Sequence, residues 1–134
     1  MTRFGDASRL ASWAGVCPGQ HESAGRQKTG RTRKGPKWLQ VHLNEAAKAA
    51  ARSKGTYLAA QYARLRPRRG HAKATVAVEH SILVAAHILD RAVPYTDLGG
   101  DWFLRRHDPE RHARHLARQI EALGFQVTLS PVAA

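Results

Sequence analysis

The most apolar segment of the chain, residues 71–91, limits the fold more than any other feature. Its apolar side chains cover most of the surface of a helical cylinder, which is typical of a helix buried on several sides. They are Val76, Val78, Ile82, Leu83, Ala86 and Leu89. The longest uninterrupted apolar run in the segment ends before His87, far short of the ~20 residues of a membrane span. We therefore predict a central core helix and no membrane partner.

Helices are also predicted near both ends of the chain, because each has a capping residue. Asp6 can accept backbone N–H bonds at the start of a short helix that continues through Trp13. Asp108 can do the same for a helix that has Pro109 at its first position and runs to about Leu123.

Two further helices are predicted in the middle of the chain. Apolar residues recur at helical spacing ahead of Gly55, which predicts a helix of about four turns. These residues are Leu39, Leu43, Ala46 and Ala50. Residues 57–65 form the next helix, and Pro67 is expected to end it, because proline disfavours helical geometry at the preceding residue. Residues 66–70 are then a basic turn.

Two segments lack helical periodicity. Residues 16–36 mix glycine and proline with polar and basic residues and predict a loop or irregular hairpin. Residues 125–129 alternate apolar and polar side chains, as a strand does. The fold class that we expect is mainly α: a small helical domain with a glycine-rich basic loop or hairpin near its N-terminus and one candidate C-terminal strand.

The charge of the chain indicates its class of partner. There are 22 Lys and Arg residues against 10 Asp and Glu, a formal net charge of +12. Such a surface attracts phosphate backbones, so nucleic acid is the leading partner. Residues 1–13 have no apolar core of the kind that a signal peptide needs, and Cys17 is the only cysteine. We expect a cytoplasmic, nucleoid-associated protein.

Two groups of basic residues are candidate phosphate contacts. The first lies between Glu22 and Glu45 with no acidic residue intervening, and its glycines would let a phosphate approach the backbone. The same composition also fits a solvated loop. This first group consists of Arg26, Lys28, Arg31, Arg33, Lys34 and Lys37. The second group surrounds Pro67 and consists of Arg66, Arg68 and Arg69.

Ser23 is the candidate nucleophile, since its hydroxyl precedes the first basic group and could attack a phosphodiester if a base activated it. A serine that simply caps a turn is the competing interpretation. No metal site is expected: His112 and His115 share a helix face, but no third ligand is evident among the surrounding arginines. The carboxylates of the chain do not cluster either.

Several short motifs together resemble one family. They are Arg3-Phe4, the segment from Leu10 to Gly19, Glu22-Ser23-Ala24-Gly25, the segment from Gly30 to Gly35, and Trp38-Leu39. This pattern resembles the C-terminal transposase domain of the bridge-RNA-guided DEDD transposases, those of the insertion-sequence one-ten, one-sixteen and nine-oh-two group. The likeness is strongest over residues 3–60. We assign residues 1–60 to the core of that domain and residues 61–134 to its helical tail.

The resemblance implies that Ser23 joins covalently to DNA during strand cleavage and exchange. In the family this serine follows a proline and precedes a glycine, positions held here by Pro18 and Gly25. The family pattern often has two adjacent serines, whereas this chain has Ser23 alone. The implied partners are DNA, a bridge RNA and protomers of the full-length transposase.

The family also has an N-terminal RNase-H-like domain, whose four carboxylates bind magnesium. No counterpart of that domain is recognisable in this sequence, so we expect a truncated transposase with no cofactor of its own and no independent strand transfer. Two other functions stay open. The chain could be a non-catalytic nucleic-acid-binding protein derived from a degenerate transposable element. It could also be an interaction module that assembles through the helix around Ile82.

Overall fold

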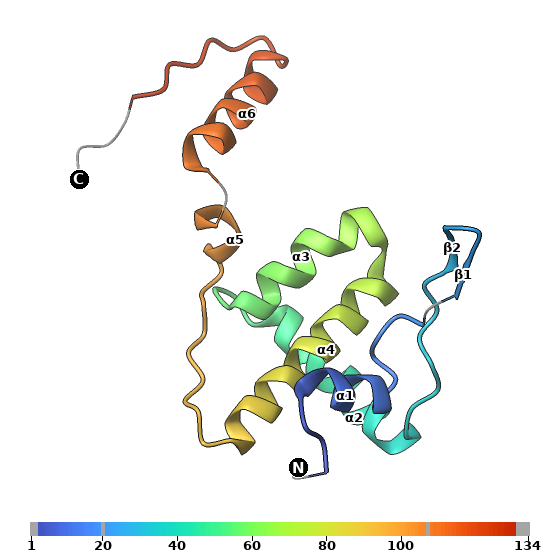
Figure 1. Cartoon of the computed structure of the whole chain (residues 1–134). Helices are drawn as coiled ribbons and strands as arrows, with labels where there is room; N and C mark the ends of the chain where they lie inside the picture. Colours follow the sequence, from blue (N-terminus) through green and yellow to red (C-terminus); the bar gives the residue numbers. More distant parts are fainter. Residues whose placement is uncertain (1–2, 20, 107, 131–134) are drawn as a thin grey trace. The chain divides into compact units, whose positions relative to one another are not determined.

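The computed structural model describes residues 3–19, 21–106 and 108–130, and it is mainly helical, as predicted (Figure 1). The chain divides into two compact units, Met1–Gly100 and Asp101–Ala134, which are described separately. In chain order the elements are α1 (Ala7–Trp13), β1 (His21–Ser23), β2 (Arg26–Thr29), α2 (Lys37–Arg52), α3 (Tyr57–Arg69), α4 (His71–Asp90), α5 (Trp102–Arg105) and α6 (Pro109–Glu121).

Helix α4 is the centre of the first unit, because it contacts α1, α2 and α3. Val78 and Leu83 are buried on it, which confirms the predicted core helix, although Leu89 near its end is exposed. By length and composition alone α4 could cross a membrane. It packs against three helices and buries the polar residues Glu79 and His87, the pattern of a core helix rather than a membrane span.

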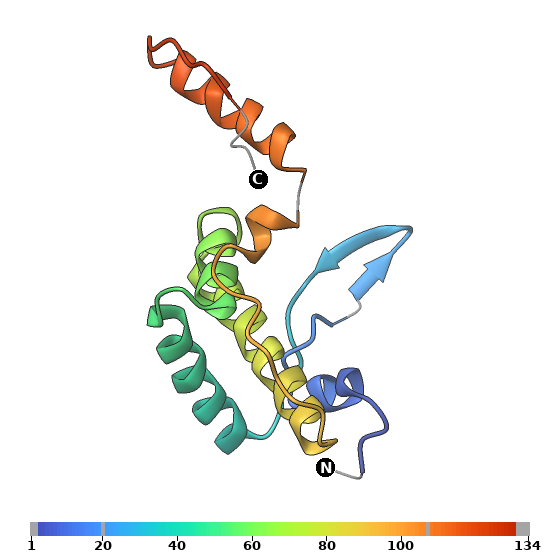
Figure 2. The ribbon, with the colours of Figure 1, turned by 90° about the vertical axis from the view of Figure 1, so that its left-hand side faces the viewer.

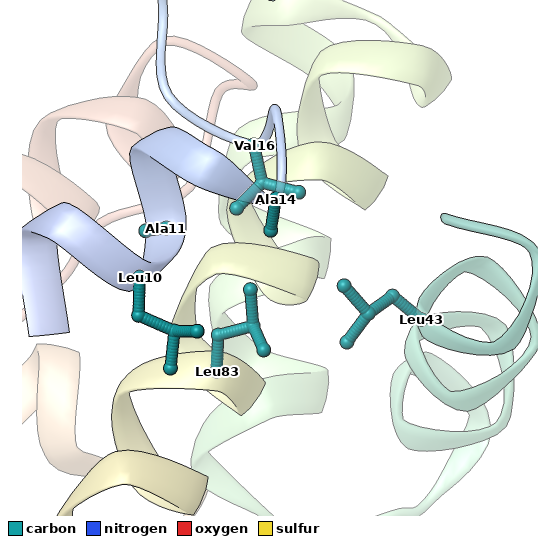
Figure 3. Packing of buried hydrophobic residues seen from close by; sticks show 6 residues of the cluster. All are labelled: Leu10, Ala11, Ala14, Val16, Leu43 and Leu83. Carbon is teal, nitrogen blue, oxygen red and sulfur yellow. The ribbon is translucent and has the colours of Figure 1, made fainter. Parts of the chain in front are cut away.

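The buried cluster of this unit joins α1 to α2 and α4 (Figure 3). Ala11 on α1 and Ala14 directly after it are fully buried, so that the backbone of α1 can approach α4 closely. Leu43 and Leu83 come from α2 and α4 to the same cluster. The hydrophobic effect of this burial fixes α1 on the two longer helices.

The N-terminus of α1 is capped as predicted. The carboxylate of Asp6 accepts a hydrogen bond from the backbone N–H of Arg9 at 2.8 Å. Ser8 donates its hydroxyl to the same carboxylate, and these hydrogen bonds lower the pKa of Asp6 from its ordinary value. At the other end of α1, the indole of Trp13 packs on the ring of Phe4, with 5.4 Å between ring centroids.

Two details of α2 and α3 differ from the sequence prediction. On α2, Leu43 is buried as expected, but the next buried residue is Ala47, four residues further on, and Ala46 is exposed. Helix α3 continues through Pro67 and ends at Gly70, so the predicted turn at residues 66–70 is wrong. Proline removes only one hydrogen bond so near the end of a helix, whereas Gly70, with φ +81°, ends it.

The segment that follows α4 returns to the start of α3. The carboxylate of Asp97 accepts a hydrogen bond from the backbone N–H of Tyr57 at 3.1 Å, and Gly100 donates to the carbonyl of Gly55 at 2.9 Å. Partial burial, together with the nearby Asp97 carboxylate, raises the pKa of Tyr95. These contacts hold residues 97–100 next to the start of α3.

The second unit consists of α5, α6 and the segment after them. Asp108 caps α6 as predicted, accepting a hydrogen bond from the backbone N–H of Glu110 at 3.0 Å. The four-residue helix α5 was not predicted. The candidate strand at residues 125–129 does not form in the described part of the chain, since an isolated extended segment has no strand to pair with. Val127 and Leu129 instead line a shallow hollow with Ala117 of α6.

A close backbone contact joins the segment after β2 to α1. A Cβ atom added to Gly35 would lie 2.0 Å from the carbonyl oxygen of Ala14. One added to Gly15 would lie 2.5 Å from the carbonyl oxygen of Arg33, and Gly15 has φ +75°. Only glycine fits both positions. The entry into α2 is therefore fixed by two glycines.

We predict that Gly35→Ala lowers the free energy of unfolding by about 1–3 kcal/mol, because the added methyl group would overlap the Ala14 backbone. Gly30→Ala is the matched control: a Cβ atom there meets nothing within 4 Å, so the change should be within about 0.5 kcal/mol. Urea denaturation of the two variants measures both effects. Equal stability of the two variants would contradict the close contact.

Candidate nucleic-acid interface

Strands β1 and β2 form an antiparallel hairpin, which agrees with the loop or hairpin expected at residues 16–36. Ser23 pairs with Arg26, so the connection between the strands is only two residues long. These are Ala24 and Gly25, with φ +52° and +72°. Positive φ at both central residues is the signature of a type I′ turn, whose twist matches that of the strands.

The hairpin has a bulge and continues beyond its two strands. Glu22 pairs with Gln27, but His21 pairs with Thr29, so Lys28 in β2 is the extra residue. Such bulges increase the local twist of a hairpin. Closer to the helices, the N–H of Gly19 donates to the carbonyl of Arg31 at 3.0 Å, which extends the two-stranded ribbon towards α1.

The hairpin projects from the helices of its unit (Figure 2). In the described part of the chain, β1 and β2 contact each other and no helix. Ser23 and Arg26 are both exposed beside the turn. As directly opposed residues they have Cβ atoms about 4.5–5.5 Å apart, so one phosphate can reach both side chains.

The first basic group extends from the turn of the hairpin to the start of α2. Lys28 is the bulge residue of β2, and the other members of the group are exposed. Lys37 is the first residue of α2, and no side chain caps that helix N-terminus. The exposed members are Arg26, Arg31, Arg33, Lys34 and Lys37. Exposed cations therefore lie beside the turn of the hairpin, at Arg26, and again between Arg31 and Lys37, up to the start of α2.

The second basic group lies on a different element. Arg66, Arg68 and Arg69 are exposed in the last turn of α3. Cations at this end of a helix are stabilised by the helix dipole, which gives the three arginines a structural role without any ligand. No contact between α3 and the hairpin brings them together with Ser23.

The positive charge is unevenly divided between the units. Met1–Gly100 holds 17 of the 22 Lys and Arg residues but only six of the ten Asp and Glu residues. In the second unit, five arginines face four carboxylates. Arg105 pairs there with Asp101 at 2.9 Å and Arg114 with Glu110 at 3.4 Å. Electrostatic attraction for a polyanion therefore belongs to the first unit.

The described side chains offer no cluster of metal ligands. Across residues 3–19, 21–106 and 108–130, no three His, Cys, Asp or Glu side chains are placed to hold an ion. His112 and His115 lie on α6, and His107 is outside the described residues. The magnesium that the family resemblance implies therefore has no fitting site among these side chains.

Two features of the interface escaped the sequence analysis. Trp38, at the second position of α2, is 64% exposed next to Lys37. The exposure of Trp38 could have been predicted from the sequence, because Trp38 lies off the apolar stripe that begins at Leu39. The other feature is Ala24, whose positive φ is uncommon for a residue with a side chain.

The N-terminal segment is similar to known transposases. Residues 1–63, slightly less than half of the chain, match the model of the Transposase IS116/IS110/IS902 family. The match supports a transposase-related function, and that family implies DNA as a partner. No curated protein and no solved structure matches the chain significantly.

We predict that Ala24→Asn stabilises the hairpin by about 1 kcal/mol, because asparagine tolerates the left-handed conformation that costs alanine about that much. Amide hydrogen exchange of residues 22–27 should slow accordingly. The control is Ala49→Asn, the same change on the exposed face of α2, which should weaken that helix slightly. Faster exchange in the Ala24→Asn hairpin would contradict the type I′ turn.

Proposed function

We propose that this chain is the DNA-handling part of a transposase and that the hairpin β1–β2 is its phosphate-binding element. The observation that carries the proposal is the position of Ser23 and Arg26 beside the turn of a projecting basic hairpin. The major groove of DNA is wide enough to admit a two-stranded β-ribbon, so a hairpin that projects from the fold can enter it. The partners proposed with it are DNA and a bridge RNA, in the nucleoid.

Ser23 is the proposed nucleophile. Its Oγ would form a bond to the phosphorus of a phosphodiester while the bond to the leaving sugar oxygen breaks and that oxygen takes up the serine proton. The resulting phosphoserine ester retains the bond energy, so that a later strand can be joined without ATP. Arg26, directly opposite, can donate two hydrogen bonds to the phosphate and stabilise the charge of the transition state.

Among the described residues, no three His, Cys, Asp or Glu side chains are placed to hold a metal ion. We therefore propose that the serine acts together with protomers that carry the acidic domain. The same observation favours a second function, a nucleic-acid-binding protein that performs no chemistry. The two functions differ only in whether Ser23 becomes attached to DNA.

Binding is tested by fluorescence anisotropy with a labelled DNA duplex at several salt concentrations. The variant Arg26→Gln/Lys28→Gln/Lys34→Gln should bind more weakly and reduce the slope of log affinity against log salt by about 2–3, since each phosphate contact contributes about 0.9. The control Arg52→Gln/Lys54→Gln/Arg118→Gln loses the same charge from other exposed positions. Equal slopes for the two variants would show that the hairpin has no special role.

Attachment is tested by mixing the chain with labelled DNA, magnesium and a family transposase that keeps its acidic domain but lacks its own serine. We predict a DNA adduct that resists SDS and has the size of this 14.8 kDa chain plus the DNA. Ser23→Ala should abolish the adduct and leave the binding affinity unchanged. An adduct that survives Ser23→Ala would remove Ser23 as the nucleophile, and no adduct at all would favour the non-catalytic function.

A further inference from the structure

Among the described residues of the first unit, Trp38 is the most exposed large apolar side chain, at 64%. Most of the indole surface is in contact with water, and covering that apolar surface with a partner would be favourable. It lies at the second residue of α2, while the helix packs on α4 through Leu43 and Ala47. The fold therefore gives Trp38 no packing role that explains a tryptophan.

Its surroundings are positively charged. Lys37 directly precedes Trp38 and Lys34 lies four residues before it, and both lysines are exposed. No acidic residue lies in the first turn of α2, and Glu45, further along the helix, is paired with Lys48 at 3.0 Å. The partner that fits an exposed indole among unopposed cations is an anion with a flat aromatic surface.

The backbone that leads into α2 and Trp38 is anchored. Gly35 is held against the backbone of Ala14, and α2 starts two residues later. The indole and its neighbouring cations are therefore presented by a rigid segment rather than a free loop. Trp13, 48% exposed, precedes Ala14, so a second indole flanks the same backbone contact in the sequence.

We infer that the base of the hairpin binds an unpaired nucleic-acid strand, with one base stacked on Trp38 and the adjoining phosphates on Lys34 and Lys37. This inference rests on the proposed function and specifies its substrate. Proteins that hold single strands combine cations for the backbone with aromatic rings for the bases. In a duplex the bases are already stacked on one another, so Trp38 would have no exposed base to cover.

The test compares three labelled probes: a single-stranded DNA of about 12 nucleotides, its RNA equivalent and the DNA duplex. Trp38→Ala should weaken binding of the single strands about 5- to 150-fold, the effect of losing one stacked base, and leave duplex binding unchanged. Trp38→Phe should retain part of the affinity. Val41→Ala, which shortens an apolar residue of α2 that is 61% exposed, is the matched control and should have no effect.

The outcomes separate this inference from the proposed function. Loss for DNA strands alone, RNA strands alone or both supports stacking and identifies the strand. Unchanged single-strand binding by Trp38→Ala, or an equal loss for the duplex, overturns the inference while the hairpin variants still test the proposed function. If the wild-type chain binds none of the probes at low salt, the proposed function fails, and the inference fails with it. Circular dichroism of Trp38→Ala should match the wild type, since the residue is exposed.

Discussion

The close approach of Gly35 to Ala14 is the contact on which the interface depends. It joins the end of the hairpin to α1, and α1 is held in turn on α2 and α4 by buried alanines and leucines. Because the contact is made between backbones, any side chain at Gly35 would separate the two segments. Lys34, Lys37 and Trp38 lie close to Gly35 in the sequence, so this contact between backbones holds their segment next to α1.

The two units of the chain differ in physical character. The first combines a small helical core with nearly all of the excess positive charge. The second balances its charges and leaves Leu123 and Phe125 exposed at 75% and 66%. The two units therefore differ mainly in charge: the first is strongly basic and the second is nearly neutral.

The sequence predicted the helices well where a cap or an apolar period defined them, as at Asp6, Asp108 and residues 71–91. It failed where tertiary context decided. Helix α3 accommodates Pro67 because the proline lies only two residues before the last helical residue, Arg69. Residues 125–129 form no strand because no other strand is available to pair with them in the described part of the chain. For the interface, the basic residues were visible in the sequence, but their arrangement on a hairpin depends on the turn at Ala24 and Gly25. The role of Ser23 stays a prediction that the resemblance supplied.

The central claim is that the hairpin and the start of α2 form the nucleic-acid-binding surface. The most direct measurement is a titration of the ¹⁵N-labelled chain with single-stranded DNA, followed by NMR amide shifts. The account predicts that the largest shifts lie in residues 22–38 and that residues 101–130 hardly change. Shifts concentrated on α6, or spread evenly over all exposed arginines, would contradict it.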